Sequence, residues 1–157
     1  MKLTKILAVV IAAVMLVIGC VSCAEAEKKV TVTLEFKGGI CSKNANLFKF
    51  PITLKVSADD ENGPSVLDVL HKFQDDNDVE LKFENDVTLI SYAGLEKGDK
   101  EDKTYMWEFL INGESPKAGK ADTNYVKDGD VITYQFIEGV TNESGKTTWK
   151  IYEEAES

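Results

Sequence analysis

Hydrophobic and polar residues alternate along several stretches of the chain with a period of two. In the clearest stretch, residues 30–37, Val, Val, Leu and Phe alternate with Thr, Thr, Glu and Lys. Similar patterns occupy residues 52–58, 79–84, 105–111, 131–137 and 147–152, and residues 87–92 are a shorter candidate. A period of two predicts β-strands that bury one face.

One stretch has the period of an amphipathic helix instead. Ser65 and Asp68 have the spacing of a capping box, in which each side chain accepts a backbone N–H at a helix start. One apolar stripe then follows, made of Val66, Leu67, Val69, Leu70 and Phe73. We expect this helix to end near Gln74, before an acidic run. Two strands, one helix and three or four more strands predict an α+β domain.

The sequence TYMWEFLINGES at residues 104–115 combines large aromatic side chains with a turn signal. Alternation places Tyr105, Trp107, Phe109 and Ile111 on one face, which matches the helix stripe. We therefore expect Trp107 to be a core residue under the helix, and any ligand to bind at the loop rim above Tyr105. Asn112-Gly113 predicts a hairpin turn, and residues 96–103 predict an exposed charged loop.

The N-terminus has the features of a secretory signal peptide. Two lysines precede an apolar run that is short for a membrane span. Residues 17–20, Val-Ile-Gly-Cys, are similar to a bacterial lipobox, which would make Cys20 the lipidated residue. The alternative is cleavage after Ala24-Glu-Ala26 and free secretion.

We expect four regions along the chain. They are a signal peptide at 1–19, a tether at 20–29, one folded domain at 30–153 and an acidic tail at 154–157. The predicted location is extracytoplasmic, as a cell-membrane lipoprotein or, alternatively, as a secreted protein.

Composition narrows the range of partners. The net charge is −9, and no residue is Arg. These features argue against nucleic acid and anionic lipid surfaces as partners. The three cysteines do not form a disulfide framework or a zinc motif, so we predict no metal site. If Cys20 carries lipid, Cys23 and Cys41 are the candidate disulfide pair.

Catalytic motifs do not appear in the sequence. It contains no GxSxG, no HExxH and no glycine-rich phosphate loop. The single histidine, His71, lies on the predicted helix without a nucleophile near it in sequence. We therefore expect a protein that is not an enzyme.

Four segments, in order, resemble the transcobalamin-like C-terminal domain family of bacterial surface and secreted proteins. They are SVLDVL at 65–70, ISYAGL at 90–95, YMWEFLINGE at 105–114 and YVKDGDVI at 125–132. The family is similar to the β domain of cobalamin carriers and to soluble-ligand-binding β-grasp domains. The resemblance covers about residues 54–136 and implies a β-grasp-like mixed sheet of four to six strands packed on one amphipathic helix.

The resemblance also implies a function as a surface-displayed binding module. Its ligand would be a small molecule such as cobalamin or another corrinoid, and no other cofactor is expected. The candidate ligand-binding residues border the variable loops: Ser91, Tyr92, Gly94, Tyr105 and Trp107. In the carriers a separate helical barrel closes over cobalamin, and this chain has no room for it. The alternative is a cell-surface protein or glycan interaction module without a small-molecule ligand, in which the sheet edges and residues 40–49 would make the contacts.

Overall fold

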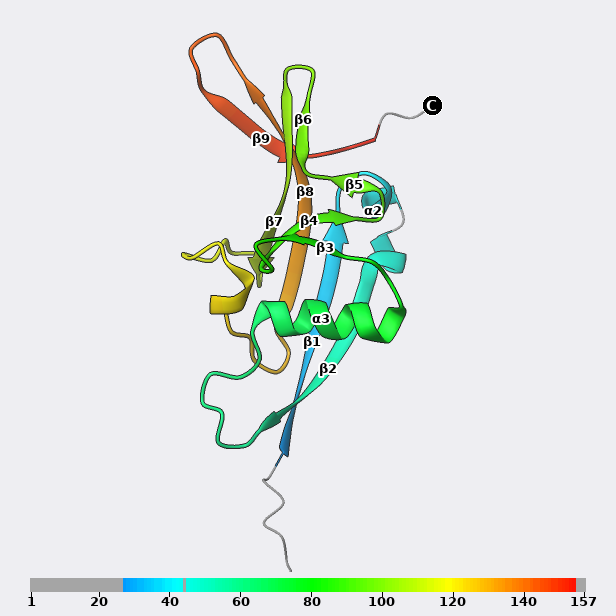
Figure 1. Ribbon diagram of the computed structural model, residues 1–157, viewed down its shortest axis with the longest axis vertical. Helices are drawn as coiled ribbons and strands as arrows, with labels where there is room; N and C mark the ends of the chain where they lie inside the picture. The colour runs from blue at the N-terminus through cyan, green and yellow to red at the C-terminus, as the bar shows by residue number, and fades with distance from the viewer. Residues whose placement is uncertain (1–26, 44, 155–157) are drawn as a thin grey trace, which may run out of the picture.

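The computed structural model describes residues 27–43 and 45–154. Two β-sheets form the framework of this part of the chain (Figure 1). The larger sheet contains β1 (Glu27–Lys37), β2 (Lys49–Ser57), β6 (Gly98–Lys100), β7 (Lys103–Ile111), β8 (Val131–Thr141) and β9 (Thr147–Ile151). The smaller sheet contains β3 (Lys82–Glu84), β4 (Thr88–Tyr92) and β5 (Leu95–Glu96). The helices are α2 (Ile40–Lys43) and α3 (Val66–Asn77), with 3₁₀ turns η1 (Ala45–Phe48) and η2 (Ala121–Thr123).

The larger sheet is mixed, with the strand order β2-β1-β8-β7-β6. β1 is antiparallel to β2 and parallel to β8, whereas β7 is antiparallel to β8. β9 pairs with the second half of β8, on the side where β1 pairs with the first half. Strand β8 is therefore the centre of the sheet, and its neighbours β1 and β9 follow each other along one side of it.

Helix α3 begins with the predicted capping box. The Ser65 hydroxyl accepts a hydrogen bond from the Asp68 N–H at 3.1 Å, and the Asp68 carboxylate accepts one from the Ser65 N–H at 2.8 Å. The helix continues three residues beyond the predicted end at Gln74, to Asn77, whose side chain donates to the Phe73 carbonyl. Asp78 then adopts a left-handed conformation and closes the helix.

The core lies between the larger sheet and two covering elements. Helix α3 lies across β1 and β2, and the smaller sheet covers the sheet beyond it (Figure 1). Phe36 of β1 is fully buried at the centre. Its ring centroid lies 4.3 Å from that of Tyr92, 5.3 Å from Phe73 and 6.0 Å from both Trp107 and Tyr134. Aromatic rings from the helix and both sheets thus join in one core.

The α+β assignment agrees with this architecture in outline, but two details of the prediction are wrong. The described residues form nine strands in two sheets, not four to six strands in one. Part of the core is also covered by a second sheet, so one helix is not the whole second layer. The sequence pattern predicted strands near β3 and β4 but missed β5 and β6, which are two and three residues long, too short to show a period. Local alternation also does not show which strands pair, so it did not reveal the second sheet.

Three local predictions are also corrected. Residues 96–103 are exposed as expected, but they are not a loop: β6 pairs with Lys103–Tyr105 across a two-residue turn. The pattern at 79–84 yields a strand at Lys82–Glu84 alone. Residues 40–49, expected to be a loop, contain α2 and η1. The Asn112-Gly113 turn is confirmed, with φ values of 52° and 84°.

Candidate functional site

The structure separates the five candidate residues into two groups. Trp107 and Tyr92 are core residues with 4% and 7% of their surface exposed. The Trp107 ring packs against Phe136, with centroids 5.1 Å apart, and against Tyr92 at 6.4 Å. Trp107 is buried as expected, but the rings around it belong to strands and not to helix α3. Ser91 is half-buried on β4.

The other two candidates, Gly94 and Tyr105, line one cavity of about 510 Å³. Gly94 is exposed in the turn between β4 and β5, with φ of 77°. Tyr105 is half-buried on β7. The cavity is lined by Gly94, Leu95, Glu96, Lys97, Gly98, Asp99, Lys100, Tyr105, Phe136, Tyr152 and Glu154. We call it the rim cavity, because it lies at the loop rim predicted above Tyr105.

Three aromatic rings form one side of the rim cavity. Tyr105 stacks on Phe136, with centroids 5.9 Å apart and ring planes 14° apart. Tyr152 meets both rings edge-on, at 5.4 Å from Tyr105 and 5.8 Å from Phe136. Phe136 and Tyr152 were not among the candidate residues predicted from the sequence. The alternation along residues 131–137 places Phe136 on one face with Ile132 and Tyr134, and Tyr152 closes the last predicted strand, so both carried a detectable signal.

Hydrogen bonds fix the aromatic side of the cavity to the segment opposite. The Trp107 indole N–H donates to the Leu95 carbonyl at 3.2 Å, which ties β5 to β7. The Tyr152 N–H donates to the Phe136 carbonyl at 2.9 Å. The Tyr152 carbonyl accepts from the Gly39 N–H at 2.7 Å. Because each of these bonds uses at least one backbone group, the shape of the cavity is set largely before any ligand enters.

Charged side chains surround the cavity in pairs. Lys97 contacts Glu84 at 2.7 Å, and Glu154 contacts Lys43 at 3.3 Å. Two residues beyond Phe136 on β8, the buried Glu138 carboxylate accepts hydrogen bonds from Lys150 and Lys103, at 2.8 and 3.0 Å. The bond from Lys150 is the largest influence that lowers the pKa of Glu138 below its usual value, so this carboxylate is ionised near neutral pH. The surroundings therefore carry both signs of charge.

A second, smaller cavity of about 240 Å³ lies beside β7. It shares no lining residue with the rim cavity. Its lining is Val87, Thr88, Leu89, Met106, Trp107, Glu108, Phe109, Ser115, Pro116, Gly119 and Tyr134. We call it the β7 slot.

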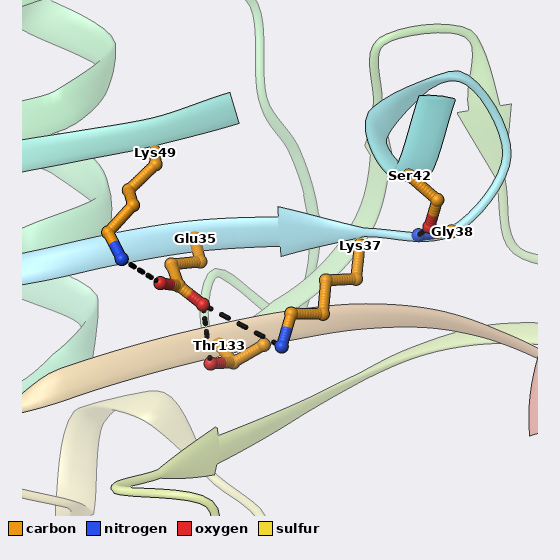
Figure 2. A network of polar contacts seen from close by, with 6 residues as sticks. All are labelled: Glu35, Lys37, Gly38, Ser42, Lys49 and Thr133. Atoms are coloured by element: carbon orange, nitrogen blue, oxygen red, sulfur yellow. Dashed lines mark hydrogen bonds and ion pairs between the residues drawn. The ribbon is translucent and has the colours of Figure 1, made fainter. Parts of the chain in front are cut away.

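The opposite face of the larger sheet carries a polar network (Figure 2). Glu35 of β1 contacts Lys49 of β2 at 2.7 Å and Lys37 at 3.7 Å, and it accepts a hydrogen bond from Thr133 of β8 at 3.4 Å. The Lys49 hydrogen bond is the main cause of a lowered pKa at Glu35. This network links three strands, so we assign it to sheet stability.

Groups with chemical reactivity are not gathered at either cavity. Cys41 is fully buried, and burial raises the pKa of its thiol to about 11, which keeps it protonated near neutral pH. His71 is exposed on α3. Across residues 27–43 and 45–154, no group of three His, Cys, Asp or Glu side chains is arranged to hold a metal ion. Among these residues, no helix is long and apolar enough to cross a membrane.

The predicted N-terminal features lie outside the described residues. They include the signal peptide, Cys20 as the lipidation site, and Cys23 as the candidate partner of Cys41. These assignments stay predictions from the sequence.

Comparison with known proteins gives two similarities. The model of a family described as a domain of unknown function (DUF4430) matches residues 63–138. This stretch nearly coincides with the one that carries the resemblance noted in the sequence, and it includes most of the residues that line the rim cavity but not Tyr152 or Glu154. No curated protein matches the chain.

The second similarity is to a solved structure, the crystal structure of haptocorrin in complex with Cbi. It has a TM-score of 0.47 and 19% sequence identity, and it covers 74% of this chain and 28% of that chain. The chain thus spans little more than a quarter of the haptocorrin length. A similarity of this size assigns neither a ligand nor an activity to the chain.

Proposed function

We propose that this protein is an extracytoplasmic binding module without catalytic activity, and that its rim cavity holds a small molecule of the corrinoid class. The single observation that carries the proposal is the aromatic side of the cavity, made of Tyr105, Phe136 and Tyr152. The volume of about 510 Å³ lies within the range of small-molecule sites. The corrinoid class itself comes from the sequence resemblance.

The geometry suits a flat ligand with polar substituents. Stacked aromatic side chains offer a planar apolar surface. The paired charges and exposed backbone of residues 96–100 can bind amide groups at its margin. Because these residues are exposed, a ligand larger than the cavity can extend beyond it into solvent.

The location is a separate part of the proposal and rests on residues 1–26. If Cys20 is lipidated, the protein fractionates with membranes, and Cys20→Ala releases it. An unchanged membrane fraction for Cys20→Ala would contradict the lipid anchor without affecting the ligand proposal.

A cavity-filling variant tests the ligand site. Gly98 lies opposite Tyr105 in the β6–β7 ladder, so a side chain at position 98 points to the same face as Tyr105. A Cβ added at Gly98 meets no atom within 4 Å, and the backbone there is not left-handed. Gly98→Phe therefore introduces an aromatic ring into the cavity without a steric clash at Cβ and without backbone strain.

The assay is equilibrium dialysis against cyanocobalamin and cobinamide, with bound corrinoid measured by its visible absorbance. Wild type and a control variant in the β7 slot, Gly119→Phe, should bind equally, whereas Gly98→Phe should bind at least tenfold more weakly. Tyr105→Ala should also weaken binding, because it removes part of the aromatic surface. Absence of binding by wild type at 100 µM corrinoid would refute the corrinoid proposal. Equal binding by Gly98→Phe would refute the rim cavity as its site.

A further inference from the structure

The outer edge of strand β7 is unpaired over part of its length. On this side β6 pairs with Lys103–Tyr105 and then ends. From Met106 to Leu110, β7 pairs with β8 on its inner side, and no described residue forms a strand pair on its outer side. Unpaired strand edges carry rows of backbone donors and acceptors that can pair with another chain.

Hydrogen bonds at the end of β7 show which backbone groups point outward. The Ile111 N–H donates to the Glu114 carbonyl at 2.9 Å, and the Ile111 carbonyl accepts from the Glu114 N–H at 3.0 Å. The next residue, Asn112, donates instead to Val131, which leads into β8. Because backbone direction alternates along an antiparallel strand, Phe109 and Trp107 point their N–H and C=O groups away from β8.

These outward groups have no hydrogen-bond partner among residues 27–43 and 45–154. The hydrogen bond from Trp107 to Leu95 is donated by the indole nitrogen, so it does not use the backbone N–H or C=O group of Trp107. Backbone N–H and C=O groups that are shielded from water are nearly always paired. Trp107 and Phe109 are only 4% and 8% exposed, and their outward backbone groups are open positions with which a further strand can pair.

The β7 slot lies along these residues. Val87, Thr88 and Leu89, which lead into and begin β4, line one side, and Ser115, Pro116 and Gly119 of the loop after β7 line another. Most of the side chains that line the whole slot are apolar, and the slot has a volume of about 240 Å³. It therefore has room for a few side chains and lacks room for a large ring system.

We propose that the β7 slot binds an extended peptide segment of a partner protein, which adds to β7 as a further strand. The segment pairs its main chain with Trp107 and Phe109 and so places roughly three residues opposite positions 107–109. One apolar side chain of the segment enters the space beside Leu89 and Pro116. Only an extended main chain supplies donors and acceptors at the spacing of alternate strand residues, which selects a peptide over a small ligand.

The occupant is a single chain from another protein and not the sheet edge of a second copy. The pairing groups lie in the slot between β4 and residues 115–119, which favours a single strand over one that is already part of a sheet. Two copies would also repel each other, because each carries a net charge of −9. The proposal is independent of the rim cavity, since the two cavities share no lining residue.

Amide hydrogen exchange measured by NMR tests this proposal at its two pairing residues. The probe is the blocked peptide acetyl-Thr-Val-Leu-Val-Thr-amide, and the control peptide has the same sequence with N-methylated alternate amides on the pairing edge. In the free protein, the Trp107 and Phe109 amides should exchange faster than those of Met106 and Glu108, which bond to β8. The probe should slow Trp107 and Phe109 at least tenfold, and the methylated peptide should not.

Two variants make the test specific. A Cβ at Gly119 meets no atom within 4 Å, so Gly119→Phe can narrow the slot without straining the backbone. It should abolish protection by the probe, whereas Gly98→Phe in the rim cavity should leave it intact. Unchanged exchange at Trp107 and Phe109 with millimolar probe would overturn the proposal. Protection that rises with protein concentration in the absence of peptide would overturn it in favour of self-association.

Discussion

Trp107→Ala tests whether the central tryptophan holds the core together. The Trp107 ring lies among Phe36, Tyr92 and Phe136, each with its centroid within 6.4 Å. Its indole N–H also bonds to the Leu95 carbonyl of β5. The substitution therefore removes contacts to β1, β4 and β8 and the direct tie to the smaller sheet.

The expected loss follows from the buried area. A Trp side chain buries on the order of 200 Å², which at about 25 cal/mol per Å² gives about 5 kcal/mol. Truncation of Phe or Trp to Ala in a core costs about 3–5 kcal/mol, which includes the cavity that is left. The Leu95 carbonyl also loses its partner, a change of about 1 kcal/mol. We therefore expect a decrease of at least about 4 kcal/mol in the free energy of unfolding.

Thermal and urea unfolding followed by far-UV circular dichroism measure this loss. For a domain of this size, 4 kcal/mol lowers Tm by about 10–20 °C. The matched control is Trp149→Ala, because Trp149 lies on β9 and is 43% exposed. Trp149→Ala should lower the free energy of unfolding by less than half as much as Trp107→Ala. If Trp107→Ala were no more destabilising than Trp149→Ala, the assignment of Trp107 to the core would be refuted.

Three further changes test other parts of the fold. Gly38→Ala should cost about 1–3 kcal/mol in urea unfolding, because φ is 106° and the new Cβ would lie 2.7 Å from the Phe136 carbonyl oxygen; a neutral result would contradict this close approach. Glu138→Gln should lower the free energy of unfolding above about pH 5, since the hydrogen bond from Lys150 stabilises the ionised form of Glu138. The difference from wild type should shrink as pH falls through the pKa of Glu138 in the folded protein. A difference that does not depend on pH would argue against the ion pairs. Ser65→Ala should cost about 1 kcal/mol through loss of the helix cap, whereas Ser65→Thr should retain most of it.

The position of the rim cavity was partly predictable. Alternation placed Tyr105 at the end of an aromatic face, and Gly94 marked the turn beside it. The sequence did not connect them with Tyr152, because that contact depends on β9 returning along β8. Tyr92 and Trp107 were selected with them as neighbours in the motifs, but the packing against Phe36 and Phe136 buries both.

The β7 slot was not predictable from the residues that line it. Val87 to Leu89, Phe109 and Ser115 to Gly119 belong to separate segments, and no motif links them. The unpaired edge of β7 exists because β6 ends after three residues. A strand that short leaves no periodic signal, so the place where pairing stops cannot be deduced from the pattern.

The sequence by itself determined the local features: the long strands, the capped helix, the Asn112-Gly113 turn and the face of its strand on which Trp107 lies. Each depends on residues within a few positions of each other, whose spacing matches the period of a strand, helix or turn. The tertiary structure alone decided the second sheet, the parallel pairing of β1 with β8, and the two cavities. These features depend on contacts between distant segments, which form only when the whole core packs and which local periodicity does not encode.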